Sequence, residues 1–439
     1  MNEISKIPYV EARFNKDGAL ENQNEVSLPA GVTDLVVMSH GWNNDAEAAR
    51  ELYRKFFENF AAVAQPNDLP GRTFAIVGVI WPSKKFDELV AASGPPGGAE
   101  GSASVKTAAD KLSDQLLEEK LERMKAFFTE PAQQKTLDEA KALLPDIAEK
   151  GSVRQEFVNK IRSLLDPASA NEEDASRTFF EDDGNELMKN LRVYEDDLDK
   201  EVAGDGEGSA SLPLGVGTVH PAEGGAAGLA TFLAGFKAAA MNVLNFTTYF
   251  EMKARAGTVG KNGVAKLIDK LAPQVQRIHL IGHSFGGRVV TATAANSSTD
   301  TIRSMSLLQT AFSHNGFSKS MKGFFRSVVD QKRVNGPILV THTKNDKPVG
   351  VAYPLASRIN GDVAAAFGDE NDKFGGLGRN GAQKMENHEV IKGNLLGASG
   401  NYSFQVGKFF NLEGSAFIKD HGDVTGKEVA HAVRKAIAG

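Results

Sequence analysis

The stretch RIHLIGHSFGGRVVTATAA, residues 277–295, decides the fold of this chain. Its first six residues, 277–282, form an apolar run that is typical of a buried strand in a parallel sheet. The part that begins at Gly286 is compatible with a helix. Residues 282–286 between them read G-x-S-x-G, which predicts a sharp turn from strand to helix. The stretch therefore predicts a strand–turn–helix unit of an α/β protein.

The turn carries Ser284 between His283 and Phe285, and we expect its hydroxyl to project from the sheet edge. The helix N-terminus behind it favours developing negative charge. The alternative is a glycine-rich turn whose serine only caps the helix. The strand before the turn and the helix after it favour the first interpretation. Glycines are needed around the serine because side chains there would collide with strand and helix: Gly282, Gly286 and Gly287.

The same rhythm of strands and helices occurs in the first 82 residues. Residues 33–39 (TDLVVMS) and 73–81 (TFAIVGVIW) are apolar runs that predict buried strands, and residues 8–14 predict another. Between the two apolar runs, 45–63 has apolar residues at helical spacing.

The rhythm resumes in residues 235–439, after a long interruption. Helices are expected at 236–256, 264–271 and 425–438, and strands at 277–282, 303–309, 337–343 and 415–418. This order predicts an α/β protein with a doubly wound, mostly parallel sheet.

The interruption, residues 83–234, is rich in Gly, Pro and acidic residues. It contains helical stripes, one of which starts at Leu112 and another at Val153. We interpret it as a large, mainly helical insertion or cap after the strand at 73–81. The expected domains are 1–82 (first part of the core), 83–234 (cap) and 235–439 (second part of the core).

Composition excludes several classes of function. The chain has 439 residues, a formal net charge of -6 and no cysteine. The acidic balance argues against nucleic acid as a partner, and the absence of cysteine excludes disulfides, thiolate metal sites and a cysteine nucleophile. No signal-peptide pattern is seen, so a cytoplasmic address is expected. Lys237 argues against a membrane span at 224–250, and membrane contact is possible but not indicated.

Two further segments supply groups that suit the chemistry of a serine. Ser39 is followed by His40, Gly41 and Trp42. We expect the N–H groups of Trp42 and Phe285 to form an oxyanion hole, with Gly41 allowing close approach of the backbone. The alternative is that His40 and Trp42 only terminate a strand.

An acid and then a histidine must follow the serine along the chain. Asp346 comes just after the strand at 337–343, and His421 lies on a glycine-containing loop before the last helix. Asp346 can orient the imidazole, which acts as general base. The alternative for Asp346 is a solvated loop carboxylate. The rival histidines are His314, His342, His388 and His431, the last expected on the surface of its helix.

The motifs S-H-G-W, G-H-S-F-G-G, T-K-N-D and D-H-G-D, in this order, resemble those of the α/β-hydrolase superfamily. The resemblance covers 1–82 and roughly 235–439, but not the insertion, and identifies no subfamily. It implies Ser284 as nucleophile, His421 as base and acid, and Asp346 as orienting residue. It also implies the Trp42 and Phe285 amides as the oxyanion hole, with no cofactor and no metal.

The apolar faces of the helical insertion are suited to bind an acyl chain, so an esterase or lipase that acts on a small-molecule or lipid acyl substrate is expected. A serine peptidase or amidase and a membrane-associated phospholipase would use the same triad. A catalytically silent binding protein on this scaffold is the alternative outside enzymes. The sequence predicts neither the acyl-chain length nor the oligomeric state.

Two other patterns are not interpreted as sites. Residues 376–381 match G-x-G-x-x-G but follow no strand, so a flexible loop is expected there rather than a dinucleotide site. The acidic runs near Glu172 and Glu181 lack the spacing of an EF-hand loop and are expected to be solvated.

Overall fold

The computed structural model covers the chain and divides it into two compact units. The first, here called the sheet unit, consists of Met1–Lys85, Met252–Pro354 and Ala365–Gly439, and the second, the helical unit, of Phe86–Glu251 and Leu355–Ala364. The helical unit thus extends beyond the expected cap. The residues described are 2–42, 44–65, 68–83, 114–171, 174, 176–192, 235–346 and 374–439.

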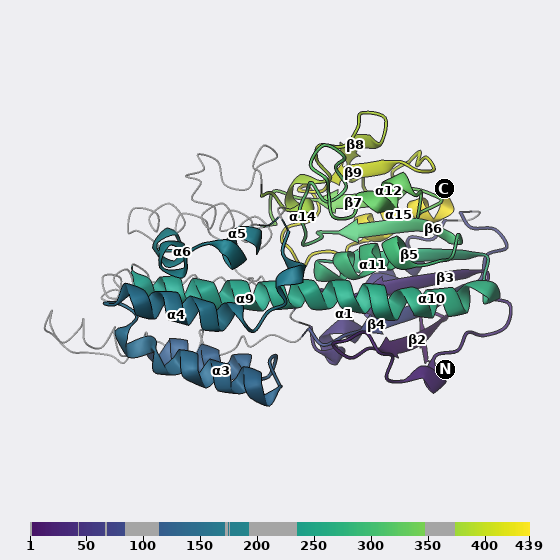
Figure 1. The fold of residues 1–439 in the computed structure, drawn as a ribbon. Helices are drawn as coiled ribbons and strands as arrows, with labels where there is room; N and C mark the ends of the chain where they lie inside the picture. Colours follow the sequence, from purple (N-terminus) through teal and green to yellow (C-terminus); the bar gives the residue numbers. More distant parts are fainter. Residues whose placement is uncertain are drawn as a thin grey trace, which may run out of the picture. The chain divides into compact units, whose positions relative to one another are not determined.

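The sheet unit is built on one nine-stranded sheet (Figure 1). The strand order is β1-β2-β4-β3-β5-β6-β7-β9-β8, and all neighbours are parallel except β1 and β2. This mostly parallel sheet with flanking helices is the α/β class that the sequence predicted. The strands are β1 Asn2–Ile4, β2 Ile7–Arg13, β3 Asp34–Ser39, β4 Phe74–Ile80, β5 Arg277–His283, β6 Ile302–Leu308, β7 Ile338–His342, β8 Val390–Asn394 and β9 Phe409–Glu413.

Helices cover the two faces of this sheet. The chain moves from β3 to β4 in one direction through α1 (Ala46–Ala62), and from β5 to β6 in the opposite direction through α11 (Phe285–Asn296). Because such crossovers are right-handed, α1 and α11 lie on opposite faces. The other helices of this unit are α10 Ala265–Leu271, α12 Arg326–Asp330, α14 Leu377–Asn380 and α15 Lys427–Ala438, with a π-helix at Val259–Val264 and 3-10 helices at Gln23–Glu25 and Ala272–Gln274.

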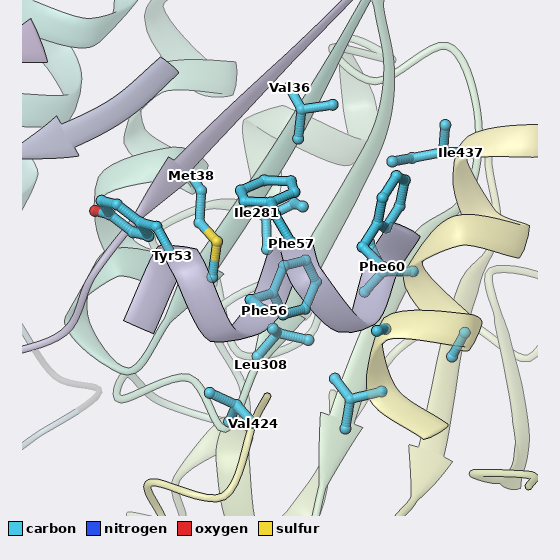
Figure 2. Close-up of a cluster of buried hydrophobic side chains, with 14 of the residues drawn as sticks. Val36, Met38, Tyr53, Phe56, Phe57, Phe60, Ile281, Leu308, Val424 and Ile437 are labelled. Atoms are coloured by element: carbon cyan, nitrogen blue, oxygen red, sulfur yellow. The ribbon is translucent and has the colours of Figure 1, made fainter. Parts of the chain in front are cut away.

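The main apolar core lies on the face covered by α1 and α15 (Figure 2). Phe56, Phe57 and Phe60 of α1 are fully buried or nearly so, and they pack with Met38 of β3 and Ile437 of α15. Burying a side chain of this size contributes about 1.5–3 kcal/mol. The helical period of 45–63 therefore follows from the need to place these rings on one face.

The strand order reverses between β3 and β5. From this pair the sheet continues to β4 on one side and to β6 on the other. In open parallel sheets, the carboxyl ends of the two strands at such a point border a crevice in which ligands bind. Gly41 follows β3 and Ser284 follows β5, so both lie at this position.

The helical unit contains 114–124 and the helices α3 Pro131–Ala142, α4 Gly151–Arg162, α5 Ser176–Glu181 and α6 Gly184–Asn190, with 3-10 helices at Leu144–Asp146 and Pro167–Ser169. Phe157 and Phe179 are fully buried, and the Phe179 ring lies 5.1 Å from the Phe250 ring. Phe250 belongs to α9 (Phe236–Thr258), whose last residues are in the sheet unit. Of the predicted stripes, Leu112 lies outside the described residues.

Three expectations about the carboxyl-terminal part are wrong. The last strand expected at 415–418 is absent from the described structure there; β9 ends at Glu413 and 415–418 form a turn. Two short strands, β8 and β9, occur instead. His431 is fully buried rather than on the surface, and its Nε2 donates to the carbonyl oxygen of Gly400 at 2.7 Å, which offsets the cost of burying this nitrogen. Residues 376–381, expected as a flexible loop, contain the short helix α14.

Among the helices in the described ranges, none has the length and apolarity that a bilayer crossing requires. The segment 224–250, in which Lys237 argued against a membrane span, falls partly on residues outside those ranges.

A buried charged cluster ties the amino ends of β3, β5 and β6 together. Asp34 is fully buried and bonds Arg72, while His279 Nε2 lies 3.0 Å from Asp34 Oδ1. His279 Nδ1 lies 2.8 Å from Ser304 Oγ. Burial would raise the pKa of Asp34, but hydrogen bonds from His279 and Arg72 outweigh it and lower that pKa well below its usual range.

Replacing Asp34 with alanine is expected to lower the free energy of unfolding of the sheet unit by about 3–5 kcal/mol, because Arg72 and His279 lose their buried partner. Urea unfolding of the full chain measures it. Glu51→Ala, which removes an exposed ion pair with Arg54, is the matched control and should leave the midpoint unchanged. Equal midpoints for both variants would contradict the assignment.

Candidate active site

Ser284 occupies a strained turn between β5 and α11. Its φ is 54° and its ψ is -124°, a region that residues other than glycine rarely adopt. The turn is held by Ser284 N–H, which donates to Leu308 O at 3.1 Å, and by Ala311 N–H, which donates to Ser284 O at 3.2 Å. The backbone strain is therefore held by β6 and the loop after it.

Glycine is required at two points where the chain approaches the turn. A Cβ at Gly286 would lie 2.1 Å from Ser39 O, and one at Gly41 would lie 2.6 Å from Ser284 Cβ. An added Cβ would lie 2.4 Å from Gly286 O at Gly282 and 2.1 Å from Thr310 Oγ1 at Gly287. The expectation that glycines are needed around the serine is thus explained by contacts between the ends of β3, β5 and β6.

Three side chains form a connected line of hydrogen bonds. Ser284 Oγ lies 2.8 Å from His421 Nε2, and His421 Nδ1 lies 2.9 Å from Asp346 Oδ2. All three residues are buried. The structure therefore brings together the serine, histidine and aspartate that the sequence suggested, from segments up to 137 residues apart.

Two opposing effects set the pKa of His421. Burial lowers the pKa, but the charge of Asp346 and the hydrogen bond to it raise the pKa, and Asp420 adds to the rise; the net shift is above the ordinary value of 6.5. An imidazole with this environment is a stronger base than one in water. The Nδ1–H faces the carboxylate, so Nε2 is left to accept the serine proton.

His283, next to the serine, holds the loop that carries His421. Its Nε2 lies 2.9 Å from the carbonyl oxygen of His421, so that nitrogen carries the proton and donates. Burial and the neighbouring His421 lower the pKa of His283 to about 3, which keeps its ring neutral. His283 is therefore a positioning residue that acts through the backbone of His421.

The loop that carries Asp346 is joined to the loop that carries His421, because Asn345 Nδ2 donates to Ile418 O at 2.8 Å. It is also joined to the stretch 376–381, because Thr343 N–H donates to Gly378 O at 2.9 Å. A Cβ at Gly378 would lie 2.8 Å from Asp346 Oδ2. The glycine-rich stretch 376–381, which was expected to be unrelated to the site, thus packs against the carboxylate.

The peptide between Gly41 and Trp42 is oriented by donors on its carbonyl side. His40 Nδ1 lies 2.9 Å from Gly41 O, and Ser83 Oγ and Asn44 Nδ2 lie 3.1 and 3.3 Å from the same oxygen. In a trans peptide the N–H points away from the C=O. The Trp42 N–H is thereby directed away from these donors.

His40 is suited to hold this peptide because it stays neutral. Burial lowers the pKa of His40 to about 4. Its Nε2 accepts the Trp81 N–H at 3.3 Å, so Nδ1 carries the proton and donates to Gly41 O. Phe285, the other expected amide donor, is the first residue of α11, and its ring lies 5.8 Å from that of Trp42.

The rival histidines have other surroundings. His314 is fully buried with its Nδ1 3.1 Å from Asn380 Nδ2, and His388 is exposed. His342 is the last residue of β7, and its carbonyl accepts from Gly414. The hydrogen bonds of Ser284 and Asp346 thus select His421 from this group.

The sequence did not point to several supporting residues. Ser83, Asn345, Gly378 and Tyr53 hold the peptides and loops of the site, and Tyr53 does so through its hydroxyl, which accepts from His40 N–H at 2.9 Å and donates to Val79 O at 2.6 Å. Ser83 and Tyr53 lie in segments without a recognisable motif, whereas Asn345 lies in T-K-N-D and Gly378 in the G-x-G-x-x-G stretch, and neither motif indicates these supporting roles. Their supporting roles become visible only in the structure, where segments distant in sequence contact one another.

The structure contains a second buried line of serine, histidine and aspartate, Ser304–His279–Asp34. Whereas Ser284 follows the carboxyl end of β5, this line lies at the amino ends of β3, β5 and β6. There Nδ1 faces the serine and Nε2 faces the carboxylate, the reverse of His421. Ser304 lies inside β6 rather than on a strained turn and is 1% exposed. This second line is closed to a substrate, and it provides a control for Ser284.

Within the described ranges, no group of three or more His, Asp or Glu side chains is placed to hold a metal ion. The expected solvation of the acidic runs holds for Glu181, which is exposed, whereas Glu172 lies outside those ranges. It is wrong for Asp174 of the first run, which is 5% exposed and accepts a hydrogen bond from Ser176 Oγ at 2.7 Å.

Comparison of the chain with family models, with curated proteins and with solved structures finds no match in any of the three. The geometry of the sheet and of the three-residue line is therefore the basis for a functional proposal.

Proposed function

We propose that this chain is a serine hydrolase of the α/β-hydrolase superfamily that cleaves a carboxylic ester through an acyl-enzyme. The observation that carries the proposal is the line from Ser284 Oγ to His421 Nε2 at 2.8 Å and from His421 Nδ1 to Asp346 Oδ2 at 2.9 Å. The strained turn under the serine and its place where the strand order reverses support it.

The proposed reaction has two halves. His421 Nε2 takes the proton of Ser284 as Oγ attacks the ester carbonyl, and then gives it to the departing alcohol as the carbonyl–oxygen bond breaks. Water then attacks the acyl-serine, His421 takes its proton, and the carboxylic acid leaves as the proton returns to Ser284. The Trp42 and Phe285 N–H groups stabilise the negative oxygen in both halves. A cytoplasmic address is part of the proposal and is tested by cell fractionation.

Hydrolysis of p-nitrophenyl esters of graded acyl length tests the function. We expect wild-type turnover that depends on chain length, loss of turnover in Ser284→Ala, and full turnover in Ser304→Ala, the matched serine of the closed line. Turnover of peptide or amide substrates above that of all esters would favour a peptidase or amidase. No turnover and no labelling by a fluorophosphonate would favour a silent binding protein.

The pH dependence of kcat/KM should reflect the raised pKa of His421. The neutral imidazole is the active form, so activity is lost as the pH falls through the folded-state pKa. Because this pKa is raised, the acid limb is expected above pH 6.5. A pH profile with a soluble ester measures it, and a limb below pH 6.5 would contradict the assignment.

Gly41→Ala is expected to lower kcat/KM by about 10²–10³-fold, as loss of an oxyanion donor does. The added Cβ would meet Ser284 Cβ at 2.6 Å and force Trp42 N–H away from the reacting oxygen. Gly31→Ala has open space around its Cβ but a φ of 81°, so it strains the backbone away from the site and serves as the control for a general effect on folding. Activity of Gly41→Ala within threefold of wild type would argue against this geometry.

A further inference from the structure

The loop 318–325 (SKSMKGFF) exposes large apolar side chains between lysines. Met321 is 43% exposed and Phe324 is 54% exposed, two of the few large hydrophobic side chains that are exposed in the described ranges. Lys319 and Lys322 on the same loop are exposed too, and they are its only charged residues. We propose that this loop docks the chain onto an anionic lipid surface.

The loop is held in shape rather than free to fold its apolar residues inward. Gly323 N–H donates to Ser318 O at 2.8 Å, Phe325 N–H donates to Gly316 O at 2.8 Å, and Ser318 Oγ donates to Lys384 O at 2.7 Å. Lys322 has a φ of 52°, a conformation that costs a residue with a side chain. The chain maintains this strain while Met321 and Phe324 face outward.

The base of the loop is anchored in the core of the sheet unit. The Phe325 ring lies 5.0 Å from Phe312 and 6.3 Å from Phe317, and both are buried. Arg326, the next residue, pairs with Glu389. A rigid base allows the tip to enter a surface without unfolding, which lowers the entropic cost of binding.

The side chains exposed on the loop 318–325 favour an anionic lipid surface as the binding partner. Apolar side chains that enter the boundary between headgroups and acyl chains, with lysines beside them, are the features that bind anionic bilayers. Protein–protein interfaces are also enriched in methionine and aromatic residues, but they are depleted in lysine. The paired exposure of lysines with Met321 and Phe324 therefore favours lipid over a protein partner.

The loop also contacts the helix that follows Ser284. Arg288 of α11 lies over the Phe324 ring at 4.8 Å and over the Phe325 ring at 5.2 Å. The loop begins after β6, where Ala311 N–H donates to Ser284 O. Docking through Met321 and Phe324 would thus bring the carboxyl edge of the sheet near the lipid, independently of the chemistry at Ser284.

Flotation with lipid vesicles tests the proposal on the full chain. We expect wild type and Ser284→Ala to float equally with vesicles of phosphatidylcholine containing about 30% phosphatidylglycerol, less so at high salt, and weakly with phosphatidylcholine alone. Met321→Ser and Met321→Ser/Phe324→Ser should lower the bound fraction progressively, the latter by about tenfold. Lys319→Gln/Lys322→Gln should remove the preference for phosphatidylglycerol.

Val406→Ser is the matched control, because Val406 is 65% exposed on another loop. It should bind as wild type does, and thermal midpoints show that all variants fold. Absence of wild-type binding, or unchanged binding of Met321→Ser/Phe324→Ser, would overturn the proposal. Light scattering that shows a dimer lost in that variant would assign the surface to a second copy and would overturn it as well.

Discussion

Ser284→Ala is expected to reduce ester turnover by about a millionfold relative to wild type, because the group that forms the acyl-enzyme is removed. The substitution deletes one hydroxyl, whose Oγ lies 2.8 Å from His421 Nε2, and leaves the turn and its backbone hydrogen bonds in place. Initial rates with a soluble ester measure it. Residual activity should come only from the backbone donors and substrate binding.

Ser304→Ala separates this effect from the loss of any buried serine. Ser304 Oγ also lies 2.8 Å from a histidine nitrogen, but it is inside β6 and away from the strained turn. Its variant should keep wild-type turnover. If Ser284→Ala retained more than a few per cent of the activity, the nucleophile would have to be sought elsewhere.

Asp346→Asn is expected to lower kcat/KM by about ten-thousandfold, the scale seen when the orienting carboxylate of a triad becomes an amide. The amide would present a donor or a neutral oxygen to His421 Nδ1 and would no longer favour the Nδ1–H tautomer. Because the charge of Asp346 raises the pKa of His421, the acid limb should also move to lower pH in this variant. The pH profile distinguishes this role from simple unfolding.

Asp420→Asn is the matched control for this prediction. Asp420 raises the pKa of His421 only through its charge, whereas His421 Nδ1 is hydrogen-bonded to Asp346. We expect a loss within about fivefold and a smaller move of the acid limb. Equal effects of the two substitutions would show that Asp346 acts by charge alone.

The strands and helices around the site were predictable from local patterns. The apolar runs 33–39, 73–81 and 277–282 are buried on both faces, so their composition alone marks them as central strands. The strand expected at 415–418 failed for a local reason. Residues 409–413 (FFNLE) form the strand, and the prediction took the apolar pair 417–418 of the following turn for strand residues.

The candidate site was predictable to the extent that motifs carried it. Ser284 follows β5 directly and Asp346 lies on the loop after β7, and both placements are visible in sequence. His421 lies on the longer loop between β9 and α15, and the sequence placed it after an expected strand at 415–418 that is not formed there. The roles of His283 and His40 in holding backbone carbonyls were not, because they depend on which nitrogen faces which oxygen across the fold. The burial of His431 was missed because Gly400, its partner, is distant in sequence.

The closed line Ser304–His279–Asp34 shows why residue types alone are insufficient. It repeats the three side chains with similar distances, yet no sequence motif marks it. Three features differ: Ser284 lies on a strained turn and Ser304 does not, the two imidazoles face their serines with different nitrogens, and the two lines lie at opposite ends of the strands. These features, together with the line from Ser284 to Asp346, are the physical basis for proposing Ser284 rather than Ser304 as the nucleophile.

Mass spectrometry after treatment with a fluorophosphonate asks whether one hydroxyl in this chain is an activated nucleophile. We predict a single adduct on the peptide that contains Ser284, and a strongly reduced rate of labelling in His421→Ala, because the imidazole that accepts the proton is gone. No adduct on wild type, or an adduct on another residue with Ser284 unmodified, would contradict the proposed reaction.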